Sequence, residues 1–152
     1  MSWKWRAAVA CALFLLAGVF LGIQLTEDRR AEERQHERLI KLRELALTPF
    51  VSDGCSGGLS SVWNTLPEAL AGALPFEACC IAHDRSYHSG GGEQTARAGY
   101  DARLAADRTL QTCVAENGGQ VVADAMFHAV RLGGGPCSGL SWRWGYGRAD
   151  CP

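Results

Sequence analysis

The chain opens with one long apolar run, which is followed by a long charged run. Residues 7–25 contain no charged side chain, and Lys4 and Arg6 precede them. At helical rise this length just spans the hydrocarbon core of a bilayer, and basic residues before such a run favour an inside-facing start. We therefore expect residues 1–25 to form a signal anchor that crosses the membrane as a helix. A cleaved signal peptide is the alternative, and the remaining chain would then be secreted.

Residues 26–47 carry six acidic and six basic side chains and contain neither glycine nor proline. Mixed charge of this kind is typical of a solvated helix, so the segment is predicted to be a helical stalk. The end of this segment is less polar than the rest, because Leu39, Leu42 and Leu45 begin an apolar stripe at helical spacing. Residues 39–47 are therefore open to a second interpretation, an amphipathic helix that packs on the following domain or touches lipid.

Residues 48–152 are interrupted by glycine-rich stretches, and they predict one small, mainly α domain with long loops. A glycine-rich loop covers residues 53–61, and glycines near positions 90, 118 and 133 separate the apolar-periodic segments. Helices are expected between these stretches, because clustered glycines end a helix. The predicted helices cover residues 75–88, 96–116 and 120–132.

The tail from residue 137 to the end is rich in glycine and aromatic residues. Trp142, Trp144 and Tyr146 alternate along it. Alternation predicts either the half-buried face of a hairpin or a small disulfide-closed loop. An aromatic patch that dips into lipid headgroups is the functional alternative.

Composition narrows the class of protein further. The formal net charge is −1, so the chain lacks the basic excess with which nucleic-acid-binding proteins neutralise phosphates, and no nucleic-acid partner is expected. Seven cysteines in 152 residues are typical of an exported protein, in which disulfides persist. Cys11 lies within the apolar run and is predicted to be a free thiol. We therefore expect the domain to lie outside the cytoplasm, in a periplasm or extracellularly.

The predicted helix over residues 75–88 gathers chemically active side chains. Cys79, Cys80 and His83 share one face, and Tyr87 lies one turn further on. Disulfides to neighbouring elements would stop this helix from rotating, and would hold His83 as rigidly as a general base must be held. Asp84 points about 100° away. A hard cation such as Ca²⁺ prefers a carboxylate of this kind together with backbone carbonyls, which the glycine-rich loop can supply.

A histidine base needs an acid to orient it, and three aspartates are candidates. Asp101 and Asp107 lie on the second predicted helix, and Asp124 lies on the third. If Cys113 bridges to the first helix, Asp107 is favoured, because it lies less than two turns before that cysteine.

Three of these motifs resemble those of the secreted phospholipase A2 family. The sequence C-C-x-x-H-D-x-x-Y at residues 79–87 resembles the active-site helix of that family. D-G-C-S-G-G at residues 53–58 resembles its calcium loop, and A-A-D-x-x-L-x-x-C at residues 105–113 resembles its second helix. The match covers residues 51–113, with only a short link between the two helices. It suggests a membrane-anchored member of the bacterial type.

The resemblance implies a fold, a reaction and a role for each matching residue. The fold would be a small, disulfide-stapled helical domain with a calcium loop. The reaction would be the calcium-dependent hydrolysis of the sn-2 ester of phospholipids in a membrane. His83 would be the general base, Asp107 would orient it, and Tyr87 would hydrogen-bond Asp107. The implied calcium ligands are the Asp84 carboxylate and the backbone carbonyls of Gly54, Ser56 and Gly58.

The same resemblance implies two disulfides, Cys55–Cys80 and Cys79–Cys113. The two cysteines of the domain that remain, Cys137 and Cys151, would then form a third disulfide. The chain also departs from the family pattern, because Gly54 stands where an aromatic residue is common and Ser56 stands where glycine is usual. Both changes leave the backbone carbonyls in place, so they are expected to alter the affinity for calcium and not to abolish calcium binding.

The same residues allow two other interpretations. In the first, the domain is a catalytically silent phospholipase A2-like fold, used as a membrane-tethered binding or toxin-like module. Adjacent cysteines with two histidines would alternatively bind zinc, although their spacing suits zinc poorly. Residues outside the motifs are assigned to packing or to the surface. The ligands of such a zinc site would be Cys79, Cys80, His83 and His88. Of the residues outside the motifs, His36 and His128 are expected at the surface or in helix packing, and Trp63 is expected in the core.

Overall fold

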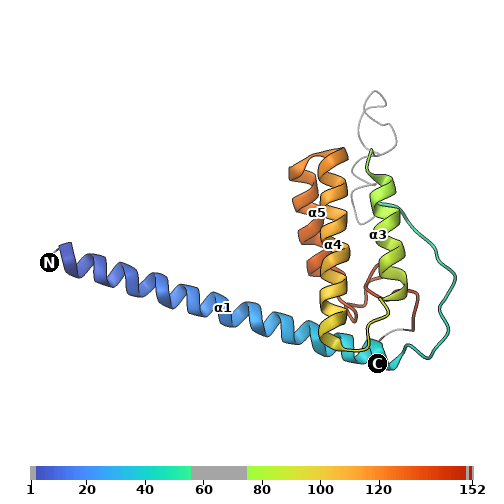
Figure 1. Cartoon of the computed structure of the whole chain (residues 1–152), viewed down its shortest axis with the longest axis horizontal. Helices are drawn as coiled ribbons and strands as arrows, with labels where there is room; N and C mark the ends of the chain where they lie inside the picture. Colours follow the sequence, from blue (N-terminus) through green and yellow to red (C-terminus); the bar gives the residue numbers. More distant parts are fainter. Residues whose placement is uncertain (1–2, 56–74, 150, 152) are drawn as a thin grey trace. The chain divides into compact units, whose positions relative to one another are not determined.

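The computed structural model of the chain describes residues 3–55, 75–149 and 151 (Figure 1). These residues form four helices and no strand, so the fold is mainly α, as predicted. The helices are α1 (Trp3–Lys41), α3 (Glu77–Ser89), α4 (Ala96–Gly118) and α5 (Gln120–Gly133). The chain divides into two compact units, Met1–Glu32 and Glu33–Pro152.

The first unit contains only the earlier part of α1. Its large apolar side chains that the structure describes are exposed, and Phe14 and Phe20 are 80% and 65% accessible. Among the residues that the structure describes, no helix is both long enough and apolar enough to cross a membrane. The side chains of residues 3–9, 11, 12 and 16 lie outside the description, and Cys11 is one of them. The signal anchor over residues 1–25 and the free thiol therefore remain predictions.

The second unit is built around three antiparallel helices, α3, α4 and α5, which lie side by side with α4 contacting both of the others (Figure 1). Thr95 caps the start of α4, where its hydroxyl accepts a hydrogen bond from the backbone of Ala98. Gly90 ends α3 in the left-handed conformation. The predicted boundaries of the three helices hold to within two residues. The differences of two residues are at the start of α3, which begins at Glu77 because the two residues before it form a turn, and at the end of α4, which extends to Gly118.

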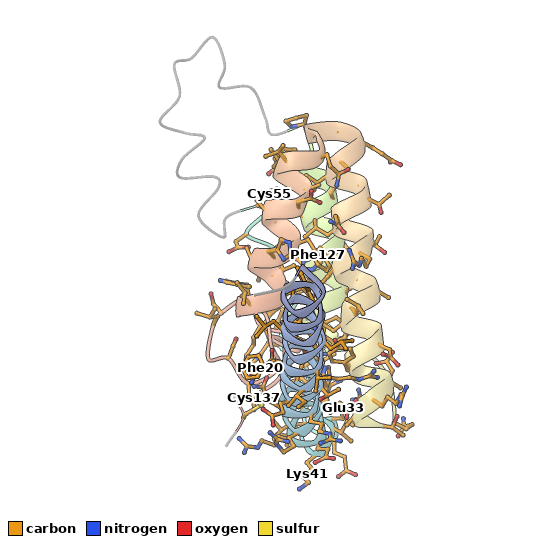
Figure 2. All side chains as sticks on the ribbon, turned by 90° about the vertical axis from the view of Figure 1, so that its left-hand side faces the viewer. Phe20, Glu33, Lys41, Cys55, Phe127 and Cys137 are labelled. Carbon is orange, nitrogen blue, oxygen red and sulfur yellow. A yellow bond between two sulfur atoms is a disulfide. The ribbon has the colours of Figure 1, made fainter. Side chains whose placement is uncertain are left out.

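The three disulfides connect Cys55 with Cys80, Cys79 with Cys113, and Cys137 with Cys151, as predicted. Figure 2 shows Cys55 beside the upper part of the helices and Cys137 near their lower end. The first two disulfides belong to one buried group, which we call the disulfide cluster. Its members are Cys55, Phe76, Cys79, Cys80, Leu110, Val114, Ala123 and Met126. The zinc alternative is wrong, because the sulfurs of Cys79 and Cys80 are both in disulfides.

The end of α1 belongs to the second unit, although the sequence pattern places it in the stalk. His36 and Leu39 are each only 1% exposed. Leu39 packs with Tyr87 and Trp144 in a second buried group, which we call the tail cluster. The amphipathic helix predicted over residues 39–47 is correct only at its start. The helix ends at Lys41, and residues 42–45 form turns and a bend that leave Leu45 exposed.

The tail after Cys137 is a disulfide-closed loop of successive turns, so the hairpin alternative is wrong. Trp144 is buried, whereas Trp142 and Tyr146 are partly exposed. Arg143 is buried among them and donates hydrogen bonds to the carbonyls of Gly145, Arg148 and Ala149. These bonds satisfy the buried guanidinium and hold the turns closed without a strand ladder.

Part of the predicted calcium loop lies outside the described residues. Ser56, Gly58 and Trp63 belong to the range 56–74.

Candidate active site

His83 lies on α3, and its side chain faces the neighbouring helix α4. Its ring is 8% exposed, and Nε2 lies 2.9 Å from Oδ1 of Asp107 on α4. The Tyr87 ring packs against it, with ring centroids 4.1 Å apart. Cys79 and Cys80, one turn earlier on α3, are bonded to α4 and to the segment before residue 56. The two disulfides therefore fix the rotation of α3, and with it the direction of His83.

Asp107 is completely buried and is surrounded by donors. Tyr87 donates its hydroxyl proton to Oδ1 at 2.6 Å, and Arg131 donates to Oδ2 at 3.0 Å. Arg103, one turn before Asp107 on α4, brings a second guanidinium to within 3.9 Å of Oδ2. Burial alone would raise the pKa of Asp107, but the hydrogen bonds from His83, Tyr87 and Arg131, with the charge of Arg103, hold that pKa below its usual range. The carboxylate is therefore ionised at neutral pH.

Tyr87 is oriented by a second arginine contact. Nε of Arg103 donates to the Tyr87 hydroxyl oxygen at 3.0 Å. Since this oxygen accepts from Arg103, its own proton is directed at Asp107. Burial raises the pKa of Tyr87 well above its usual range, so the phenol remains a donor.

The ionised state of Asp107 decides the tautomer of His83. An ionised carboxylate only accepts hydrogen bonds, so Nε2 of His83 must carry a proton. In the neutral ring, Nδ1 then has a free lone pair. Within the described part of the chain, no hydrogen bond to Nδ1 is seen. His83 is therefore prepared to accept a proton at Nδ1, as a general base must.

Asp84 follows His83 on α3 but faces a different group. Ser52 donates its hydroxyl proton to Oδ2 of Asp84 at 2.6 Å and accepts from the backbone N–H of Gly54 at 3.1 Å. Burial raises the pKa of Asp84; the Ser52 hydrogen bond opposes this rise, and the charge of Asp53 adds to it. A bound cation would offset the effect of Asp53 on Asp84.

A cavity of about 100 Å³ joins these groups. His83, Asp84, Asp53 and Gly54 line one part of it. The remaining lining is largely apolar and comes from α4, α5, the tail and one disulfide: Leu110, Met126, Ala129, Val130, Trp142, Cys55 and Cys80. The arrangement combines a base, an oxygen-rich corner and an apolar wall.

The donors in the oxygen-rich corner suit a hard cation such as Ca²⁺. Asp84 and Asp53 line this part of the cavity, and Gly54 adopts a positive φ of 67°, which lets the loop turn sharply there. In the described ranges, no group of three or more His, Cys, Asp or Glu side chains is placed to hold a metal. The predicted site would not depend on such a group, because three of its four predicted ligands are backbone carbonyls, and two of these, from Ser56 and Gly58, lie outside the described residues.

The candidate residues therefore separate into two sets. The structure brings together His83, Asp107, Tyr87, Asp84 and Gly54 as the sequence motifs predict. The other candidate acids lie elsewhere: Asp101 is exposed, and Asp124 accepts hydrogen bonds from Gln111 and Gln120.

Sequence reasoning missed three contributors, Ser52, Arg103 and Arg131. Only Arg103 had a signal in the sequence, since it stands four residues before Asp107 on the same helix.

No protein-family model, no curated protein and no solved structure matches the chain. The features that point to a function are therefore the three motifs and the geometry of this site.

Proposed function

We propose that the protein is a calcium-dependent phospholipase A2 that hydrolyses the sn-2 ester of glycerophospholipids. The observation that carries the proposal is the pair of His83 and Asp107, 2.9 Å apart, on a cavity that also has an acidic corner and an apolar wall. The three motifs that resemble the family support the same reaction. The three disulfides support a location outside the cytoplasm.

In this reaction the chain's own residues move one proton. A water molecule gives a proton to Nδ1 of His83, and its oxygen attacks the carbonyl carbon of the ester. The imidazolium formed is stabilised because Nε2–H points at the ionised Asp107. The proton on Nδ1 then passes to the leaving alcohol as the C–O bond breaks, which releases a fatty acid and a lysophospholipid.

The acidic corner supplies the remaining chemistry. Asp84 and the Gly54 carbonyl would hold Ca²⁺, which polarises an ester carbonyl and stabilises an oxyanion when bound. Ser52 fixes Asp84 by its hydrogen bond and so keeps the carboxylate directed. The apolar wall, which includes Met126 and Trp142, suits an acyl chain, because burial of hydrocarbon is favourable there.

The first test removes the base. The full chain is incubated with phosphatidylcholine–detergent mixed micelles in Ca²⁺ or in a chelator, and released fatty acid is measured. His83→Gln is expected to lose about a hundred- to ten-thousandfold in rate, because general-base catalysis at this site disappears. His88→Gln is the matched control, since His88 is buried five residues later on α3 and contacts Phe50 and Tyr146 instead of Asp107. Normal hydrolysis by folded His83→Gln contradicts the proposal.

The second test separates enzyme from binding module. Calorimetry should show Ca²⁺ binding that is lost in Asp84→Asn and kept in Asp101→Asn, an exposed aspartate on α4. Calcium-dependent binding to vesicles without any hydrolysis would favour the catalytically silent module instead. Undiminished Ca²⁺ binding by Asp84→Asn would place the metal elsewhere.

A further inference from the structure

Both oxygens of the Asp107 carboxylate are occupied, and by partners on different helices. Oδ1 accepts from His83 and Tyr87, which are both on α3. Oδ2 accepts at 3.0 Å from Nη1 of Arg131, which is near the end of α5. The carboxylate on α4 is thus held from two sides.

Arg131 is itself held in place by its surroundings. Its guanidinium lies over the Tyr100 ring, 5.2 Å from the centroid. Nη2 of Arg103 donates to the backbone carbonyls of Arg131 and Val130, at 3.0 and 2.6 Å, which anchors the last turn of α5 beside the site. A planar guanidinium directed in this way offers a donor in a fixed orientation, which an ammonium group does not.

Resting on the proposed hydrolysis, we propose that Arg131 is a positioning residue that acts on His83 through Asp107. Rotation of the carboxylate about its Cβ–Cγ bond would move Oδ1 out of line with Nε2 of His83. A donor fixed on Oδ2 opposes that rotation. Arg131 is not among the residues that line the cavity, so its effect belongs to the chemical step and not to lipid binding.

Arg108 supplies a matched control. It lies on α4, one residue after Asp107, and its guanidinium lies over the Phe127 ring of α5 at 4.2 Å. Its Nη1 also donates a hydrogen bond to Oε1 of Gln111, and the Arg108 side chain is exposed. Arg108 therefore bridges α4 and α5 as Arg131 does, but it takes no part in the contacts of Asp107.

The kinetic test compares Arg131→Met, Arg131→Lys and Arg108→Met in the full chain with mixed micelles and Ca²⁺. Loss of a residue that orients a catalytic group typically costs ten- to a hundredfold, so Arg131→Met should lower kcat by about tenfold or more. KM should stay within about twofold, because lipid contacts are unchanged. Arg131→Lys keeps the charge without the planar donor and should be intermediate, whereas Arg108→Met should match the wild type.

A second measurement is independent of turnover. The Nε2 proton of His83, identified by its absence in His83→Gln, should give a low-field proton NMR signal while it is hydrogen-bonded to Asp107. This signal should be lost or broadened in Arg131→Met and retained in Arg108→Met. The milder Arg131→Lys variant gives the same readout if Arg131→Met does not fold.

The outcomes separate the two proposals. If the wild type hydrolyses lipid and folded Arg131 variants keep both kcat and the signal, the positioning role is overturned, even if their melting temperatures fall. If the wild type does not hydrolyse lipid, the proposed function fails. The NMR signal then still decides whether Arg131 fixes the pair of His83 and Asp107.

Discussion

The disulfide cluster and the tail cluster stabilise opposite ends of α3 by different means. At the first end, Cys79 and Cys80 join the helix covalently to its neighbours, within an apolar group. At the other end, Leu39, Tyr87 and Trp144 pack closely with no covalent link among them. His83 lies between the two, so both ends determine where its ring points.

Close approach at the tail cluster depends on glycine. Gly145 donates its backbone N–H to the Tyr87 carbonyl at 2.6 Å, and Gly90 lies against both Gly145 and Leu39. A methyl group added to Gly145 would stand 2.7 Å from Cδ1 of Leu39. One end of α3 is thus fixed by covalent bonds, whereas the other is fixed by close steric fit alone.

The largest effect is expected from breaking the disulfide cluster. Replacing Cys79 and Cys113 together by alanine should lower the free energy of unfolding by about 4 kcal/mol, because the bridge closes a long loop. Removing Cys137 and Cys151 should cost about 0.8 kcal/mol less on loop length alone, since the sequence separations are 34 and 14 residues. Urea unfolding at 25 °C measures both. A larger loss from the tail disulfide would reverse the ranking.

Breaking the tail cluster should come next. Leu39→Ala is expected to cost about 3 kcal/mol, because it leaves a cavity beside Tyr87 and Trp144. Leu45→Ala is the control, since Leu45 is 51% exposed. Equal stability of the two variants would mean that the end of α1 does not hold the domain together.

A smaller loss of stability is expected from substitutions that test the steric fit between Gly145 and Leu39. Gly145 and Gly139 share a φ of 77°, but only Gly145 has neighbours within contact distance of an added methyl group. Alanine at Gly139 should cost about 1 kcal/mol from backbone strain alone. Alanine at Gly145 should cost about 1–2 kcal/mol more, from the clash with Leu39. In a Leu39→Ala background this excess should largely disappear, which a double-mutant cycle in urea detects.

The smallest effect concerns pH. Because the folded protein holds the pKa of Asp107 below its usual range, this group stabilises the fold fully above the unfolded-state pKa of about 4. The contribution is lost as the pH falls through the lower, folded-state pKa. Unfolding curves between pH 6 and the acid limit should therefore show a steeper loss for the wild type than for Asp107→Asn. Parallel pH profiles would contradict an ionised Asp107.

The sequence predicts the disulfide end of α3 far better than the tail end. Short spacings within single helices are enough to place Cys79, His83 and Asp107 correctly, since each motif fixes its own face. Packing of Leu39 against Trp144 joins residues about a hundred positions apart, and neither lies in a recognisable motif. Arg131 and Ser52 were missed because neither lies within one of the three motifs, and their own surroundings in the sequence are ordinary.

The adjacent cysteines of α3 have a consequence for how the protein must be produced. If Cys79 paired with Cys55 and Cys80 paired with Cys113, the product would be a covalent isomer with the same mass and no free thiol in the domain. Neighbouring positions on a helix differ by about 100° in direction, so α3 would have to turn about its axis to form these bonds. His83 would then swing away from Asp107. Preparations that are fully oxidised can therefore contain two populations, and only the pairing seen in the structure brings His83 to Asp107.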